Sequence, residues 1–136
     1  MRVDWAIPCR YAEVHPQSGA TIIGAGADLI IAPQIPTPVQ VLFVVRFVGA
    51  PEEVKGDAHP VTCRVLDPDG SEIGQQTAEI TTELTQVVTG YVAEVTIPMG
   101  ILLLVAQYGT YRVEWTIDGG DPLPVPIHVV EPPTAL

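Results

Sequence analysis

Basic residues are scarce in this chain. Lys and Arg total 6 against 16 Asp and Glu, which gives a formal net charge of −10 over 136 residues. A field of that sign repels phosphate backbones and anionic lipid headgroups. We therefore expect no nucleic-acid partner and no membrane partner. The acidic residues are spread along the chain rather than gathered in a tail, which is typical of a solvated, soluble surface.

Long apolar runs are also missing. No stretch approaches the roughly 18–20 consecutive apolar residues that a membrane-spanning helix requires. The opening MRVDWAIPCRYAEV is interrupted by Asp4, Pro8, Arg10 and Glu13, so it lacks the continuous apolar segment of a signal peptide. The sequence therefore predicts a cytoplasmic protein.

Cysteine and histidine are too few and too scattered to suggest a metal centre. Cys9 and Cys63 form no CxxC pair, and His15, His59 and His128 lie far apart in sequence. A zinc site normally uses closer spacing or several thiolates. We expect no metal and no cofactor, and we interpret both cysteines as small buried residues whose redox state stays open.

Two acidic turns raise the question of chemistry. In DPDGSE, Asp67, Asp69 and Gly70 resemble the start of a calcium loop, but the remaining ligands and the flanking helices of an EF-hand are missing. Asp-Pro-Asp-Gly is also a favourable turn sequence, and that interpretation is preferred. Asp118 and Asp121 flank a Gly-Gly turn, and we expect their carboxylates to keep the turn and the adjoining strand face solvated.

Other catalytic motifs are missing too. GAGAD lacks the GxGxxG spacing of a dinucleotide loop, and neither Ser18 nor Ser71 has the flanking residues of a nucleophile elbow. We expect no catalytic residue, no cofactor-binding residue and no enzymatic activity.

What the chain does have is strict alternation of apolar and polar residues. Tyr111, Val113, Trp115 and Ile117 alternate with polar residues, and similar runs recur between turns rich in Gly and Pro. Period two places alternate side chains on opposite faces of a strand. The pattern predicts an all-β fold, a single-domain immunoglobulin-like antiparallel β-sandwich of seven to nine strands over residues 1–131, with a frayed tail at 132–136. A small β-barrel is the alternative.

Individual segments carry further expectations. The opening strand should place Val3, Trp5 and Ile7 on one face, and the proline-rich PQIPTP should be a crossing connection. The spacing of residues 80–88 fits a helix, but its threonines disfavour one. In PMGILLLVAQYG, we expect one helical turn that caps the core.

Two segments have more apolar residues than one core face can accept. VQVLFVVRFVG is apolar on both faces, and the block at 102–105 cannot point into a single core. Surplus apolar surface marks association sites. The candidate interface is therefore Leu42, Val44, Val48, Leu102, Leu103, Leu104 and Val105, with a protein partner or a homo-oligomer as its occupant. The alternative is that both segments are central core elements.

Two stretches of the chain resemble known protein groups. GTYRVEWTIDG followed by LPVPIHV resembles the closing strand pair of immunoglobulin-like modules, which implies that the Tyr111 hydroxyl pins a corner of the fold. DWAIPCRYAEV with GATIIGAG and APQIPTPV is similar to the N-terminal half of a group of uncharacterised bacterial proteins. That similarity implies a small bacterial or phage-encoded domain and carries no site residues with it.

Three hypotheses of function follow. The favoured one is a non-enzymatic β-sandwich for self-assembly or protein binding, such as a component of a bacterial or phage-like particle. The second is a module that binds a small apolar ligand near Trp5, Trp115 and Tyr91. The third, a hydrolase or a metal-dependent enzyme, requires convergence of residues from the set His15, His59, His128, Asp67 and Asp69.

Overall fold

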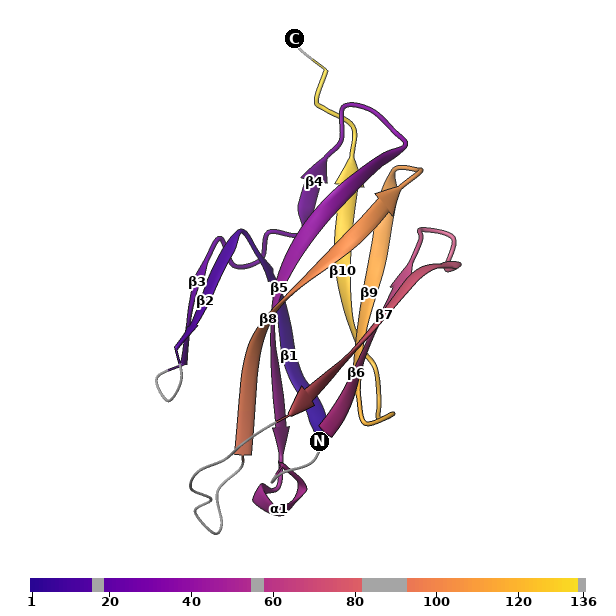
Figure 1. Ribbon diagram of the computed structural model, residues 1–136. Coiled ribbons are helices and arrows are strands. Elements are labelled where there is room, and N and C mark those ends of the chain that lie inside the picture. Colours follow the sequence, from indigo (N-terminus) through magenta and orange to yellow (C-terminus); the bar gives the residue numbers. More distant parts are fainter. Residues whose placement is uncertain (16–18, 55–57, 82–92, 135–136) are drawn as a thin grey trace.

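The computed structural model describes residues 1–15, 19–54, 58–81 and 93–134, and it is built almost entirely of strands (Figure 1). The elements are β1 (Arg2–Cys9), β2 (Tyr11–His15), β3 (Gly19–Ile23), β4 (Leu29–Ile31), β5 (Thr37–Gly49), α1 (Pro51–Val54), β6 (Ala58–Leu66), β7 (Glu72–Thr81), β8 (Ala93–Val105), β9 (Gly109–Ile117) and β10 (Leu123–Val130). No helix in these ranges is both long enough and apolar enough to span a membrane.

The strands form two facing sheets and a hairpin. One sheet has the order β1-β5-β8 and the other the order β4-β10-β9-β6-β7, while β2 and β3 pair with each other and project to one side (Figure 1). The predicted all-β sandwich is confirmed. The two facing sheets contain eight described strands, within the expected seven to nine, and the separate β2–β3 hairpin brings the described strands to ten.

Strand β4 also departs from the expected antiparallel arrangement. It pairs parallel with β10, whereas β5, the next strand along the chain, belongs to the other sheet. The proline-rich segment between β4 and β5 therefore crosses from one sheet to the other, as expected. Strands β4 and β10 are far apart in the chain, so no hairpin turn forces them to be antiparallel.

The core lies between the sheets and follows the alternation seen in the sequence. Phe43 on β5 meets Trp115 on β9 edge to face, with ring centroids 5.3 Å apart and an interplanar angle of 65°. Each fully buried large side chain contributes about 1.5–3 kcal/mol by leaving water. The largest fully buried side chains are Trp115, Tyr111, Phe43, Phe47, Leu103, Ile117 and Ile127.

Strand β1 changes face part-way along. Its register with β5 shifts between Val3 and Trp5, so Asp4 is an extra residue. Val3 and Ala6 pack against the core, while Trp5 lies opposite Arg46 of β5. The expectation that Val3, Trp5 and Ile7 share one face is wrong, because a one-residue bulge inverts the pattern of a strand.

Residues 93–105 form one uninterrupted strand. Their register with β5 runs from Ala93 opposite Gly49 to Val105 opposite Thr37 without a shift. The expected helical turn in this segment is therefore wrong. Pairing with β5 gives hydrogen-bond partners to backbone N–H and C=O groups that a helical turn would have paired within the segment. Of the residues with helical spacing at 80–88, Ile80 ends up buried near the end of β7, and the others lie outside the described residues.

A tyrosine fixes the corner where β9 begins. The Tyr111 hydroxyl donates to the Gln107 carbonyl oxygen at 2.8 Å, and the Gln107 backbone N–H donates to the same hydroxyl at 3.3 Å. This is the local contact that the resemblance to immunoglobulin-like modules implied for Tyr111.

Candidate functional site

The outer face of the β1-β5-β8 sheet carries the apolar residues that the core does not use. On β5, Val41, Phe43, Val45 and Phe47 belong to the core, so the residues between them face outward. Val44 is nevertheless fully buried. It is covered from both sides, since its register partners are Ile7 on β1 and Pro98 on β8.

Strand β8 divides its apolar block by period two. Ile101, Leu103 and Val105 are buried in the core, whereas Leu102 and Leu104 remain 52% and 57% exposed on the outer face. The register with β5 decides this division, because Leu103 lies opposite the core-facing Val39.

The seven candidate interface residues thus differ in their exposure to solvent. Leu102 and Leu104 are exposed and Leu42 is half-buried, so these three are accessible to a partner. The other four lie buried within the chain itself: Val44, Val48, Leu103 and Val105. Interface formation stays a prediction, and the accessible part of it is smaller than the sequence indicated.

A groove lies where the end of β1, strand β5 and strand β4 of the other sheet come together. It has a volume of about 630 Å³ and is lined by residues that include Cys9, Leu29, Leu42 and Gly100. Leu29 comes from β4 of the other sheet and is 59% exposed. Sequence reasoning missed Leu29, because its approach depends on the crossing connection between the sheets. Leu42 and Gly100 are register partners, so the groove adjoins the face that carries Leu102.

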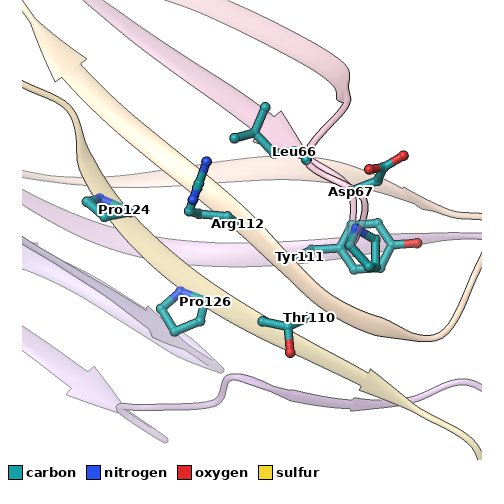
Figure 2. Close-up of a pocket in the computed structure, with 9 residues that line it drawn as sticks. Leu66, Asp67, Thr110, Tyr111, Arg112, Pro124 and Pro126 are labelled. Atoms are coloured by element: carbon teal, nitrogen blue, oxygen red, sulfur yellow. The ribbon is translucent and has the colours of Figure 1, made fainter.

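A smaller hollow of about 280 Å³ lies on the outside of the five-stranded sheet. Figure 2 shows Arg112 on β9 beside Pro124 and Pro126 on β10, with the DPDG turn at the rim. In that turn the Asp67 carboxylate accepts hydrogen bonds from the backbone N–H groups of Asp69 and Ser71, each at 2.9 Å. This is the turn-forming role that the sequence favoured for Asp67.

Charged side chains cross the same sheet surface as a connected set. Arg64 pairs with Glu72 at 2.8 Å and approaches Glu114 at 3.7 Å, while Arg112 pairs with Glu114 at 3.0 Å. Glu114 is only 9% exposed. Its carboxylate therefore does more than keep a strand face solvated: it bridges two arginines across β6 and β9.

His59 and Asp118 meet at one end of the sandwich. His59 lies on β6 and is buried, and its Nδ1 lies 2.9 Å from Asp118 Oδ2. Asp118 Oδ2 also lies 3.2 Å from the amino terminus of Met1. Burial raises the pKa of the Asp118 carboxyl, but the hydrogen bonds and charges of His59 and the amino terminus outweigh burial and leave that pKa below its ordinary value.

The expectation that Asp118 only solvates a turn is therefore wrong. The residue adopts a positive φ of 54° at the end of β9, which turns its carboxylate toward β6. Sequence reasoning could not find this pair, because His59 and Asp118 are 59 positions apart.

The remaining histidines make local contacts. His15 Nε2 lies 3.0 Å from Thr21 Oγ1, and His128 Nδ1 lies 3.0 Å from Thr110 Oγ1. Within the part of the chain that the structure describes, no group of three His, Cys, Asp or Glu side chains could hold a metal ion. Of the residues proposed to converge for hydrolysis or metal binding, Asp67 and Asp69 share one turn, while the side chains of the three histidines contact other residues.

Comparison with models of protein families shows which family the chain belongs to. A model of a family of unknown function, DUF6941, matches residues 4–130, from the first strand to the end of the last. The chain belongs to the DUF6941 family. The expected membership of an uncharacterised family is thereby confirmed. A search of curated proteins found no match.

The aromatic residues proposed for ligand binding in this DUF6941 protein do not form one lining. Trp115 is fully buried in the core, whereas Trp5 lies opposite Arg46, on the outer face of the other sheet. Tyr91 lies outside the described residues.

The two cysteines of the DUF6941 protein are buried and free. Burial raises the pKa of the Cys63 thiol to about 12, and it also raises the pKa of Cys9. A thiol with a raised pKa is a poor nucleophile, because the thiolate is the reactive form. The accessible leucines of β8 and the adjoining groove are therefore the features that best suit a functional site here.

Proposed function

We propose that this DUF6941 protein is a non-enzymatic β-sandwich that works by binding protein, including its own copies. In this proposal it is an immunoglobulin-like module in the cytoplasm that serves as a component of a bacterial or phage-like particle. The observation that carries the proposal is the exposure of Leu102 and Leu104 on the outer face of β8.

The surroundings of these leucines support a contact surface. Leucine on a soluble surface is ordinary when isolated, but neighbouring exposed apolar side chains mark interaction sites. Leu102 and Leu104 are two residues apart on one strand, and Gln40 and Pro38 of β5 lie opposite them in the register. The surface is therefore uncharged in a chain of net charge −10.

Three acidic side chains that could carry chemistry have structural partners that account for their positions. Asp67 holds a turn, Glu114 bridges two arginines, and Asp118 bonds His59 and the amino terminus. These contacts explain the residues without invoking catalysis, and this supports a binding role over an enzymatic one.

A second candidate function rests on the groove beside β8. A volume of about 630 Å³ with Leu29 and Leu42 among its lining residues would admit a small apolar molecule. Titration with a fluorescent apolar probe tests this candidate. It predicts saturable binding that Leu42→Asp weakens at least tenfold, and the absence of saturable binding contradicts it.

Sedimentation velocity over a hundredfold range of protein concentration tests the primary proposal. We expect the wild type to form species heavier than the monomer as concentration rises, and the double variant Leu102→Ser/Leu104→Ser to remain monomeric. Ile31→Ser is the matched control, because Ile31 is 53% exposed on another edge strand. A wild type that stays monomeric throughout, or a double variant that assembles as the wild type does, contradicts self-assembly through this surface.

A further inference from the structure

Most outer strands of the two sheets carry features that prevent pairing with another chain. Natural edges are protected by charge, proline, bulges or short length. Strand β1 has a bulge at Asp4 and a proline at Pro8, and β4 is only three residues long. Strand β7 carries Glu72 and Glu79, with a register shift in its pairing with β6.

Strand β8 lacks these protections over residues 99–105, which we term the β8 edge. It pairs with β5 without a register shift, and Pro98 and Glu94 both precede this stretch. The sequence MGILLLV contains no charge and no proline. Within the described ranges, β5 is the strand that pairs with β8 in its sheet, and the opposite side of β8 has none.

We propose that the β8 edge pairs antiparallel with the β8 edge of a second copy, about a twofold axis through Leu103. The two three-stranded sheets would then form one continuous sheet across the dimer. This inference rests on the proposed function, because it names the partner and the residues through which self-assembly takes place.

The alternation of side chains restricts the register of this pairing. Directly opposed residues of an antiparallel pair point to the same face, so the twofold axis must pass through a residue and not between two. An axis through Leu103 places Leu102 opposite Leu104 of the second copy on the outer face. An axis through Leu102 would instead place Leu102 opposite its own copy and Leu104 opposite Gly100, so one leucine pair would replace two.

The side chains on the core face of β8 favour the same register. With the axis through Leu103, Ile101 lies opposite Val105 of the second copy. These residues are buried in the core of each sandwich, so the paired strands would extend both cores. Both faces of the proposed pair of β8 strands are thus apolar in this register.

The lack of charge on this edge permits a second copy of this chain as the occupant. Two chains of net charge −10 repel each other, and the repulsion is least where the contacting surfaces are neutral. Residues 95–105 carry no charged side chain. A basic partner would be selected by acidic side chains along the edge, and this stretch offers it none.

Disulfide trapping between two variants that each carry one introduced cysteine tests the register. Leu102→Cys and Leu104→Cys are prepared separately, then mixed and oxidised, because the proposed dimer brings these two positions directly opposite each other. Opposed positions in an antiparallel pair have the Cα separation that a disulfide requires. We expect the mixture to form crosslinked dimer at least fivefold faster than either variant alone, as measured on non-reducing gels.

Two controls accompany the mixture. The wild type reports any crosslinking through Cys9 and Cys63, which are buried. A mixture of Leu29→Cys with Ile31→Cys has the same two-residue spacing on exposed positions of β4, another edge strand. We expect neither control to crosslink above background.

The outcomes separate this inference from the proposed function. A wild type that self-associates while the mixture crosslinks no faster than either single variant overturns the β8 pairing and leaves self-assembly standing. Equal crosslinking in the β4 mixture also overturns the β8 pairing. A wild type that is monomeric at all concentrations overturns both the β8 pairing and self-assembly.

Discussion

Phe43 and Trp115 hold the two sheets together at their centre, since their rings meet edge to face with centroids 5.3 Å apart. Both side chains are fully buried, and they come from opposite sheets. The sandwich therefore depends on a contact between residues that are remote in sequence.

Trp115→Ala tests the energetic weight of this contact. We expect the free energy of unfolding to fall by about 3–5 kcal/mol, because removal of a large buried aromatic leaves a cavity. Urea denaturation at pH 7 measures the change. Tyr11→Ala is the control, because Tyr11 is 51% exposed, and its effect should stay within about 1 kcal/mol. Equal effects of the two substitutions would contradict the packing described here.

The sandwich itself was predictable from sequence, because the alternation in β9 survives in the structure. Tyr111, Val113, Trp115 and Ile117 are all buried, as period two requires. The alternation of apolar and polar residues depends only on neighbouring positions in the sequence. A strand with a regular register therefore keeps its apolar residues on one face.

Other features were not predictable, because they depend on the partner strand. The bulge at Asp4 inverts the face of Trp5, and alternation in the sequence gives no sign of it. The apolar block on β8 could have placed either Leu102 or Leu103 inward, and only the register with β5 decides between them. Likewise, His59 and Asp118 become neighbours only when β6 and β9 pair.

The corner at Gln107 offers a second test of stability. Tyr111→Phe removes the hydroxyl that both donates to and accepts from the Gln107 backbone. We expect a loss of about 1–3 kcal/mol, because backbone groups at a partly buried corner are left without a partner. Thermal or urea unfolding measures it. A loss below the experimental error would show that the hydroxyl does not secure the corner.

The lowered pKa of Asp118 predicts a dependence of stability on pH. The folded-state pKa lies below the ordinary value of 3.8, so the unfolded chain binds a proton more readily at acid pH. Stabilisation by Asp118 is therefore present above that value and is lost as pH falls through the folded-state pKa. We expect Asp118→Asn to flatten the fall of the free energy of unfolding in this acid range.

Asp121→Asn is the matched control for that experiment, because Asp121 is an exposed carboxylate beyond the same turn. Its pH profile should follow that of the wild type. Identical profiles for the wild type and Asp118→Asn would contradict the account of the His59–Asp118 contact.

Glu114 provides a test of the charged surface. Glu114→Gln keeps the size of the side chain but removes the charge that bridges Arg64 and Arg112. We expect a modest loss of about 0.5–1 kcal/mol, since both arginines are half exposed and can be solvated by water. Urea denaturation at low and high salt measures the loss, which should shrink as salt screens the pairs. A loss independent of salt would contradict a mainly electrostatic role.

The central claim is that residues 99–105 of β8 are a contact surface for protein. Hydrogen–deuterium exchange measured at low and high protein concentration tests it most directly, because strand pairing protects the backbone amides that take part. We predict slower exchange in residues 99–105 at high concentration, with residues 29–31 of the β4 edge unchanged. Exchange in residues 99–105 that is the same at both concentrations would contradict the claim.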